Sequence, residues 1–321
     1  NIALPWLFGS KSDLSPLAGP YAAFLGSGYD PVWTDFEGDG TRVVPSLNDK
    51  QTAEVRDPFA GVKPDGRFRL SAATRQPGLT HRRFELRRAL LDQFDASRNW
   101  LTSHGGIGSW DRHQQAAWSL LTADRIRQAL DVQREPDSLR QRYGMTLFGQ
   151  SCLAARRLVE AGSRFVSVFW DPWGPYGGSC WDTHANHFPR LKEYLLPVFD
   201  QTYASLLADL DERGLLDETL VLCLSEHGRT PKIDSKPRGA GRHHWSRAYS
   251  AALAGGGTAR GRIVGSTDSI GGDVASTPIS PKDILASTLH LLGIDPHLTV
   301  PDAFGQPRPV AGDGRVRDEL F

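Results

Sequence analysis

The stretch TLVLCLSEHG, residues 219–228, decides the fold class. Its apolar residues run without interruption to Leu224, a pattern typical of strands that are covered on both faces in a parallel sheet. Glu226 and His227 follow immediately, and ligands gather where parallel strands end. The preceding segment, 188–214, carries apolar side chains at helical spacing. A helix that leads into a buried strand and then into polar residues indicates an α/β protein with a site at the strand end.

The same alternation continues on both sides of this stretch. Pro197 is expected to kink or split the helix at 188–214, and Gly214 ends it. Ser280 and Pro281 are typical of the first turn of a further helix. The remaining elements are predicted strands at 164–171, 248–257 and 262–268, and that helix at 280–294. This order predicts a largely parallel central sheet flanked by helices.

The first half of the chain has a different character. Residues 1–80 are rich in Gly, Pro and Asp, have weak periodicity, and are expected to form loops with short helical pieces. Apolar spacing then predicts three helices, at 82–103, 108–132 and 136–162. No linker separates the halves. We therefore predict one domain, in which residues 1–162 form a loop-rich, helical insertion or cap and residues 163–321 carry the α/β site.

Composition excludes several classes of protein. The 321 residues contain 37 acidic and 37 basic side chains, so there is no global charge to attract nucleic acid or an anionic membrane. No apolar run is as long as a membrane span, and no secretory signal is present. Because the chain begins at Asn1, we expect that a leader or a longer segment precedes it.

The three cysteines do not suggest a disulfide framework or a zinc ribbon. Cys152 and Cys223 fall in apolar patterns, where a free thiol acts as a small hydrophobic group. Cys180 lies beside Asp182 in a Gly-rich loop and could be a ligand, but we expect a bystander.

Histidines give the main functional signal. Five of the ten lie in three short groups: CWDTHANHF at 180–188, SEHGRTP at 225–231 and GRHHW at 241–245. Two of these groups also carry a carboxylate, and imidazole with carboxylate is a ligand set for Zn²⁺, Mn²⁺ or a similar ion. Adjacent histidines seldom reach one ion together, so His243 and His244 are not both expected to be ligands. The other five histidines are expected to be structural: His81, His104, His113, His290 and His297.

Arg229 follows the second group and has two possible roles. Its guanidinium could hold a phosphate or sulfate oxygen pair, or it could form a salt bridge that shapes the loop. No Walker motif and no G-x-S-x-G elbow is present, which argues against a nucleotide-binding loop and a serine triad.

Several motifs together resemble the bacterial, sulfatase-like family known as domain of unknown function 1501. The resemblance covers nearly the whole chain, and its motifs follow the order of that family: 22–33, 143–170, 177–233, 241–257, 265–268, 280–296, 304–310 and 314–321. That family is in turn similar to the alkaline phosphatase superfamily. The resemblance implies an alkaline phosphatase/sulfatase-like fold.

The resemblance also implies a site for one or two divalent ions, Zn, Mn or Ca. Asp182, His184 (or His187) and His244 match the first metal position, and Glu226 and His227 match the second. The nucleophile and one further Asp of such sites come from the N-terminal part of these proteins, which we expect to lie upstream of this chain. The sequence departs from the family at His227, where an apolar residue is usual, and at His243, where an acidic residue is usual.

The function implied is hydrolysis of a sulfate or phosphate ester of a small molecule or glycan. Arg229 would stabilise the transferred group, and His187 and His243 would contact the substrate. The resemblance further implies an exported or periplasmic protein. The alternative is a non-catalytic protein of the same fold that binds a glycan or a protein partner at the cell surface.

Overall fold

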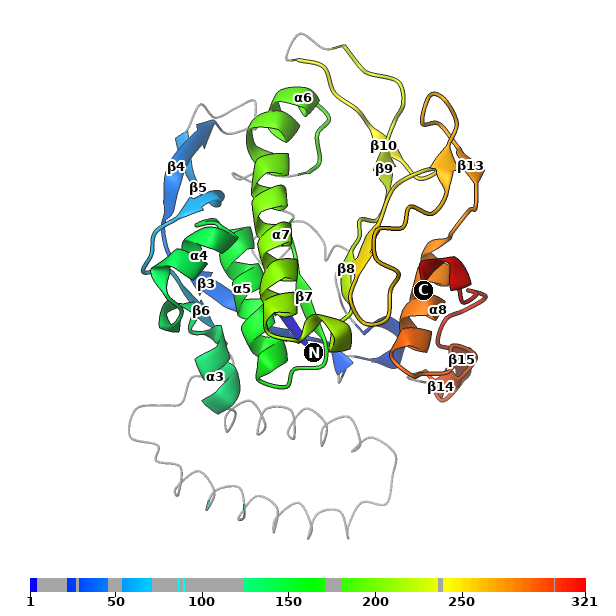
Figure 1. Cartoon of the computed structure of the whole chain (residues 1–321), viewed down its shortest axis with the longest axis horizontal. Coiled ribbons are helices and arrows are strands. Elements are labelled where there is room, and N and C mark those ends of the chain that lie inside the picture. The colour runs from blue at the N-terminus through cyan, green and yellow to red at the C-terminus, as the bar shows by residue number, and fades with distance from the viewer. Residues whose placement is uncertain are drawn as a thin grey trace.

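The structure is a computed structural model (Figure 1), and it describes residues 1–4, 22–26, 29–45, 54–70, 124–170, 181–235, 239–302 and 304–321, with the isolated positions 86 and 89. Strand β1 (Ile2–Leu4) is the central strand of a parallel sheet with the order β2-β1-β7. Its neighbours are β2 (Val32–Trp33) and β7 (Val166–Val168). The first residues of the chain therefore share a sheet with the predicted strand at 164–171.

The expectation of loops and helical pieces over residues 1–80 was wrong for the described part. Two antiparallel pairs follow β2: β3 (Asp35–Glu37) with β6 (Arg67–Arg69), and β4 (Gly40–Pro45) with β5 (Glu54–Val62). These strands are short or contain Pro and Gly, as β5 does at Pro58 and Gly61, so they lack a clear alternation of apolar and polar residues.

The α/β class is confirmed, but a largely parallel central sheet is not. Among the described residues the parallel sheet has three strands, and each of the other sheets has two antiparallel strands. The stretch at 219–228 contributes β8 (Val221–Cys223), which pairs antiparallel with β11 (Ala252–Ala254). The expected burial was also wrong, because all three residues of β8 are only partly buried and Leu224, directly after it, is 50% exposed. An apolar run encodes neither the direction of a strand nor the number of its neighbours. The remaining pairs are β9 (Gly228–Arg229) with β10 (His244–Trp245), β12 (Ser266–Thr267) with β13 (Val274–Ser276), and β14 (Thr299–Pro301) with β15 (Pro307–Pro309).

The helices follow the sequence more closely. The segment predicted at 136–162 is broken into α4 (Asp137–Tyr143) and α5 (Leu147–Glu160), because Gly144 adopts a φ of +94°. Helix α3 (Asp124–Leu130) is the described end of the prediction at 108–132. Of the prediction at 82–103, only positions 86 and 89 are described, and both are helical. Short 3₁₀ turns occur at η1 (Ala23–Leu25), η4 (Val132–Arg134), η7 (Leu216–Glu218) and η8 (Asp318–Leu320).

The segment predicted at 188–214 is one continuous helical rod with a local defect. It consists of α6 (His187–Arg190), the π-helical turn η6 (Leu191–Leu195) and α7 (Leu196–Glu212). Pro197 lies in the first turn of α7, where its missing N–H accounts for the wider turn before it. Helix α8 (Pro281–Leu291) begins with the predicted Ser280 cap, which forms a complete capping box with Asp283.

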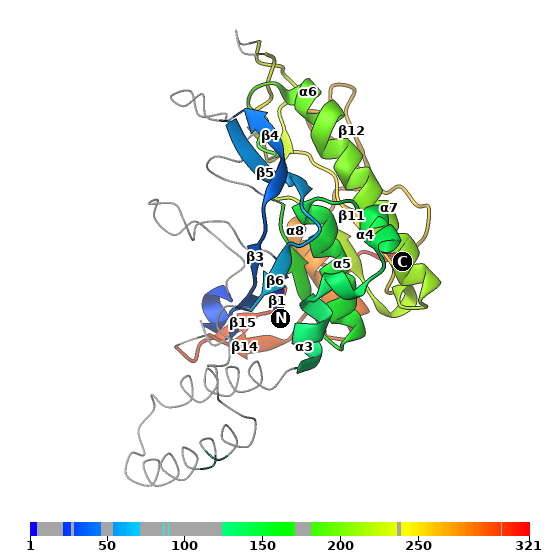
Figure 2. The same cartoon turned by 90° about the vertical axis from the view of Figure 1, so that its left-hand side faces the viewer.

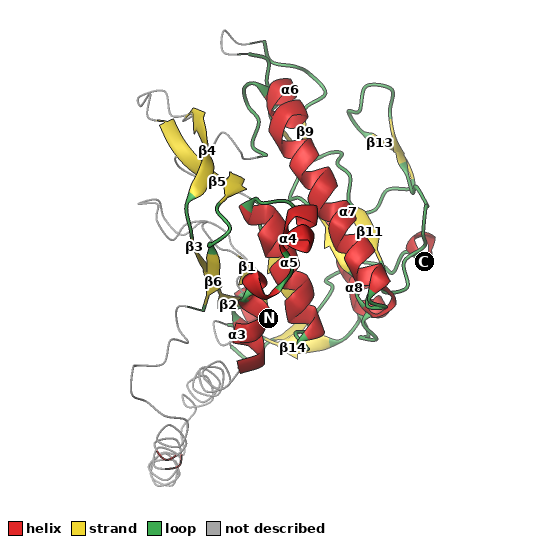
Figure 3. Cartoon of the chain, turned by 60° about the vertical axis from the view of Figure 1, so that its left-hand side comes forward, coloured by secondary structure: helices red, strands yellow, loops and turns green. Residues whose placement is uncertain are grey.

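The main hydrophobic core lies between α5 and the strands at its side. Leu153 and Leu158 of α5 are fully buried against a cluster that includes Leu4 of β1 and Phe59 of β5. Figures 2 and 3 show α4, α5 and α7 covering one side of β1 and β3–β6. The hairpin β9–β10 and helix α8 lie on the other side of α7 from β3–β6 (Figure 1). The core therefore anchors α7, and the start of α6 faces the hairpin that carries the site.

Candidate metal centre

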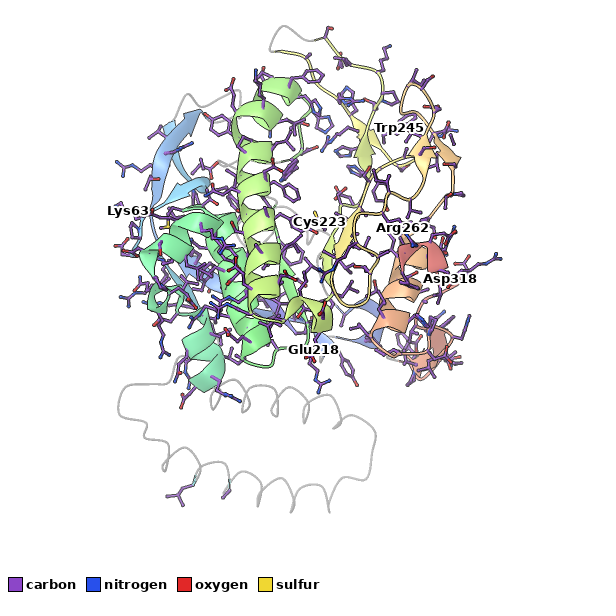
Figure 4. All side chains as sticks on the ribbon, in the orientation of Figure 1. Lys63, Glu218, Cys223, Trp245, Arg262 and Asp318 are labelled. Carbon is purple, nitrogen blue, oxygen red and sulfur yellow. The ribbon has the colours of Figure 1, made fainter. Side chains whose placement is uncertain are left out.

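Two segments build the site: the loop 181–187, which leads into α6, and the hairpin formed by β9 and β10. Arg229 on β9 is directly opposite His244 on β10. Opposed residues of an antiparallel pair place their side chains on the same face of the ribbon. Trp245, labelled in Figure 4, ends β10 and donates from its indole Nε1 to the carbonyl of Gly272 at 2.7 Å, which ties the hairpin to the next loop.

Backbone contacts hold the loop against the hairpin. The amide of Arg242 donates to the carbonyl of Thr183 at 3.3 Å, and the amide of His187 donates to the carbonyl of Ala240 at 2.9 Å. Between these bonds, Gly241 approaches His184 so closely that a Cβ at Gly241 would lie 1.8 Å from the His184 carbonyl oxygen. Only glycine fits there, and its absent side chain sets the distance between the two segments.

Three predicted ligands meet at one point. The Nε2 atoms of His184 and His244 each lie 2.9 Å from Oδ1 of Asp182, and 3.0 Å from each other. No other group of three or more Asp, Glu, His or Cys side chains in the described residues comes this close together. Ligand atoms about 2.1 Å from one ion lie about 3.0 Å apart at octahedral angles and about 3.4 Å apart at tetrahedral angles, so the spacing fits one face of an octahedral site with the opposite face open.

Hydrogen bonds alone do not satisfy this triangle. Each Nε2 carries one proton or one lone pair. If both nitrogens are protonated towards Asp182, two N–H groups face each other across 3.0 Å; if one is not, its lone pair faces an anion. A cation held by all three atoms removes both conflicts.

The electrostatics of the ligands agree with cation binding. Burial raises the pKa of Asp182. Hydrogen bonds from His244 and Arg229 lower it by a larger amount, so the pKa lies below its ordinary value of 3.8. Burial lowers the pKa of His184 below 6.5, although the charge of Asp182 opposes this shift. At neutral pH the site therefore presents an anionic oxygen and a neutral imidazole, the forms that bind metals.

The guanidinium of Arg229 donates hydrogen bonds to protein groups beside the three candidate ligands. Its Nη2 donates to Oδ1 of Asp182 at 2.8 Å and to the carbonyl of Trp181 at 3.0 Å, and its Nη1 donates to the carbonyl of Arg242 at 3.4 Å. These contacts match the loop-shaping salt bridge considered from the sequence. A direct role of Arg229 in catalysis stays a prediction.

Glu226 and His227 lie beside the triangle and are not part of it. Glu226 is exposed, and its Oε1 lies 3.2 Å from Nε2 of His227. The ring of His227 packs on that of His244 with 4.1 Å between centroids. The structure does not bring these two predicted ligands together with the other three, and their binding of a second ion stays a prediction.

The two histidines predicted to contact substrate have different surroundings. His187 is buried, and its Nδ1 lies 2.6 Å from the hydroxyl of Thr183. Burial is also the main cause that lowers its pKa. His243 is half-exposed, with Nδ1 2.9 Å from Nδ1 of His184 and Nε2 2.9 Å from Oδ2 of Asp234. Contact with substrate stays a prediction for both.

Sequence reasoning missed Asp234 and Gly241. Asp234 lies between the second and third histidine groups, without a motif that marks it, and its backbone pairs with Gly241 through two hydrogen bonds of 2.9 Å. The signal that could have found Gly241 is its position immediately before Arg242 and the histidine pair. Of the histidines expected to be structural, His290 stacks on Phe321, and His81, His104 and His113 lie outside the described residues, as does Cys180.

Comparisons with known proteins identify a family and no individual relative. The model of a family described as "Protein of unknown function (DUF1501)" matches residues 16–321. No curated protein and no solved structure matches the chain. Among the described residues, no helix combines the length and the apolar character that a membrane span requires.

Proposed function

The chain belongs to the DUF1501 family of proteins of unknown function, and from the geometry of its site we propose that it binds a divalent cation and hydrolyses sulfate or phosphate esters. Asp182, His184 and His244 would hold the ion. The single observation that carries this proposal is the triangle of candidate ligand atoms, whose mutual contacts of 2.9 to 3.0 Å suit a shared cation.

The donor set favours Zn²⁺ or Mn²⁺ over Ca²⁺. Two of the three atoms are imidazole nitrogens, which suit zinc and similar transition metals, whereas Ca²⁺ takes oxygen ligands. When bound, such an ion polarises an ester oxygen and lowers the pKa of a coordinated hydroxyl or water. Three protein ligands leave positions for a substrate, as catalytic metal sites require and closed structural sites do not.

We favour hydrolysis of sulfate or phosphate esters over other metal-assisted reactions because the sequence motifs resemble a family that we propose to be related to sulfatases and the alkaline phosphatase superfamily. The order of the ligands in the chain supports the same relationship, with Asp182 and His184 on an early loop and His244 far downstream. An exported location and a small-molecule or glycan ester as substrate follow from this similarity and belong to the same proposal.

A non-catalytic role is the second candidate, and one observation favours it. Glu226 and His227, which match the second metal position of such enzymes, pair with each other beside the triangle. A site with one ion and no second position could bind a sulfated or phosphorylated group without cleaving it.

The metal content of the purified protein tests the proposal first. After dialysis against Zn²⁺ or Mn²⁺, elemental analysis is expected to give one equivalent in the wild type and none in Asp182→Ala or His244→Ala. His290→Ala is the matched control, because His290 lies on α8 and is expected to leave metal content unchanged. Equal metal content in all four proteins contradicts the site.

Turnover then separates the two candidate functions. Release of nitrophenol from 4-nitrophenyl sulfate or phosphate by the metal-loaded wild type, lost in Asp182→Ala, supports hydrolysis. A metal-loaded protein that binds these esters and does not cleave them supports the binding role instead.

A further inference from the structure

Asp234, His243 and His184 form a chain of side-chain contacts that ends at the metal ligands. Oδ2 of Asp234 lies 2.9 Å from Nε2 of His243, and Nδ1 of His243 lies 2.9 Å from Nδ1 of His184. The other nitrogen of His184, Nε2, is a corner of the ligand triangle. We propose that Asp234 and His243 are positioning residues that fix the tautomer of His184 so that its Nε2 lone pair faces the cation. This inference rests on the proposed function, which supplies the cation that His184 would bind.

The position of each proton follows from the donors and acceptors along the chain. An ionised carboxylate only accepts, so the proton of a neutral His243 is on Nε2. Nδ1 of His243 is then an acceptor, and a proton on Nδ1 of His184 makes the 2.9 Å contact between the two atoms a hydrogen bond. That leaves Nε2 of His184 deprotonated, which is the form that a metal binds.

The backbone of the hairpin holds this chain in place. Asp234 is paired with Gly241 through both of its backbone groups. The amide of His243 donates to the hydroxyl of Thr230 at 3.0 Å, and the amide of Thr230 donates to the carbonyl of His243 at 2.8 Å. Both positioning residues therefore belong to the same hairpin as His244, and one folded unit orients two of the three ligands.

Partial exposure limits the size of the effect. The side chains of Asp234 and His243 are 38% and 45% exposed, so water competes for their hydrogen bonds. Removal of the group that orients a metal-bound histidine typically costs 10- to 100-fold in affinity. We expect about tenfold here, at the lower end of that range.

The tautomer of His184 in the metal-free protein is the direct test. Long-range ¹⁵N–¹H NMR of the imidazoles is expected to show a proton on Nδ1 of His184 in the wild type. In Asp234→Asn and His243→Leu, the Nε2–H tautomer should become populated. A wild-type His184 with its proton on Nε2, or a tautomer that neither variant changes, overturns the proposal.

Zinc affinity, measured by competition with a chromophoric chelator, tests the consequence for binding. Asp234→Asn and His243→Leu are expected to bind Zn²⁺ about tenfold more weakly. His243→Asn places an amide oxygen near the position of Nδ1 and is expected to restore most of the affinity. In the His243→Asn background, Asp234→Asn should have no further effect, which a general loss of structure would not reproduce.

A control variant and two possible outcomes distinguish failure of this inference from failure of the proposed function. Asp217→Asn removes an exposed carboxylate that pairs with Arg260 and should change neither readout. If the wild type binds no metal but His184 carries its proton on Nδ1, the proposed function fails, and the control of the His184 tautomer by Asp234 and His243 stands. If metal binds and His184 is protonated on Nε2 before binding, only the control of the His184 tautomer by Asp234 and His243 fails.

Discussion

Gly241 sets the separation of the two segments that carry the ligands. Its ideal Cβ position lies 1.8 Å from the carbonyl oxygen of His184 and 2.9 Å from the amide nitrogen of Ala185, both of them backbone atoms. Because backbone cannot swing away as a flexible side chain can, any larger residue must push the loop and the hairpin apart. His244, which lies on β10 of the same hairpin, would move with it.

Gly241→Ala is therefore expected to weaken Zn²⁺ binding about tenfold or more, the cost of a displaced ligand. Chelator competition measures the loss. Gly261→Ala is the control, because alanine is unfavourable at the Gly261 φ of +68° but its Cβ would enter open space. The control should lose stability without losing affinity. Equal affinity in Gly241→Ala and wild type would contradict the close approach.

At this scale the sequence predicted the three residues that meet, and it predicted more ligands than the structure brings together. The short groups of carboxylate and imidazole made Asp182, His184 and His244 candidates, and the family resemblance assigned them to one metal position, with His187 as the alternative to His184. Glu226 was predicted on the same grounds, but its side chain is 79% exposed and pairs with His227. Residue type shows what a side chain can bind, whereas the direction in which it points depends on pairing along the hairpin.

Helices α4 and α5 show how a short break determines the packing of an element. Gly144 ends α4 with a positive φ of 94°, and Thr146 starts α5 by accepting a hydrogen bond from the amide of Gly149 at 3.0 Å. The break lets Gln150 donate back to the carbonyls of Arg140 and Gly144 at 3.0 Å. In a single straight helix these two carbonyls would accept the amides of Gly144 and Phe148 instead, and the buried side-chain amide of Gln150 would lose both acceptors.

Removal of the cap should destabilise the protein without altering the site. Thr146→Ala is expected to lower the free energy of unfolding by about 1 kcal/mol, the usual cost of losing such a cap. Thr146→Ser keeps the hydroxyl and should retain most of that stability. Urea denaturation of the metal-free proteins measures both. A similar loss in the serine variant would assign the effect to the methyl group rather than to the cap.

Elements with strong local signals were predictable, and elements defined by their partners were not. The helix over 188–214 and the capped helix that begins after Ser280 follow from apolar spacing and end signals. Strand β1 has three residues, and its identity comes from pairing with β2 and β7, which lie far along the chain. The direction of β8 likewise depends on β11, which the apolar run itself does not encode.

Across the whole molecule, a buried network of charges joins α5, α7 and the segment between α3 and α4. Arg156 has no exposed side-chain surface and pairs with Asp209 of α7 and with Glu135, both at 2.9 Å. Asp209 also accepts from Tyr143 at 2.8 Å and from Arg213 at 2.8 Å. Removal of one member leaves a buried charge without its partner, which is more costly than the pair itself is stabilising.

This network predicts a loss of stability in acid. Burial opposes ionisation of Asp209, but hydrogen bonds from Arg213 and Tyr143 and the charge of Arg156 lower its pKa below the ordinary value of 3.8. A pKa that is lower in the folded state gives stability that is complete above 3.8 and lost as the pH falls towards the lowered value. The free energy of unfolding should therefore decline as the pH falls below 3.8.

Asp209→Asn should lose about 3–5 kcal/mol at neutral pH, the usual cost of breaking a buried ion pair. Its free energy of unfolding should also decline less steeply in acid, because one of the titrating groups is gone. Denaturant titrations at a series of pH values measure both effects. Asp217→Asn, which removes a surface carboxylate, should match the wild type throughout.

The separation of the ligands along the chain has a consequence beyond chemistry at the site. Asp182 and His244 are 62 residues apart, and the helical rod and β8 lie between them. An ion that joins them is a reversible cross-link around that whole segment, and it is available only to the folded state. At a free ion concentration 100 times Kd, such a ligand adds about 2.7 kcal/mol to folding. With the proposed ion bound, the lifetime of the protein would follow the supply of metal in its surroundings, and starvation for the ion would remove the molecule itself.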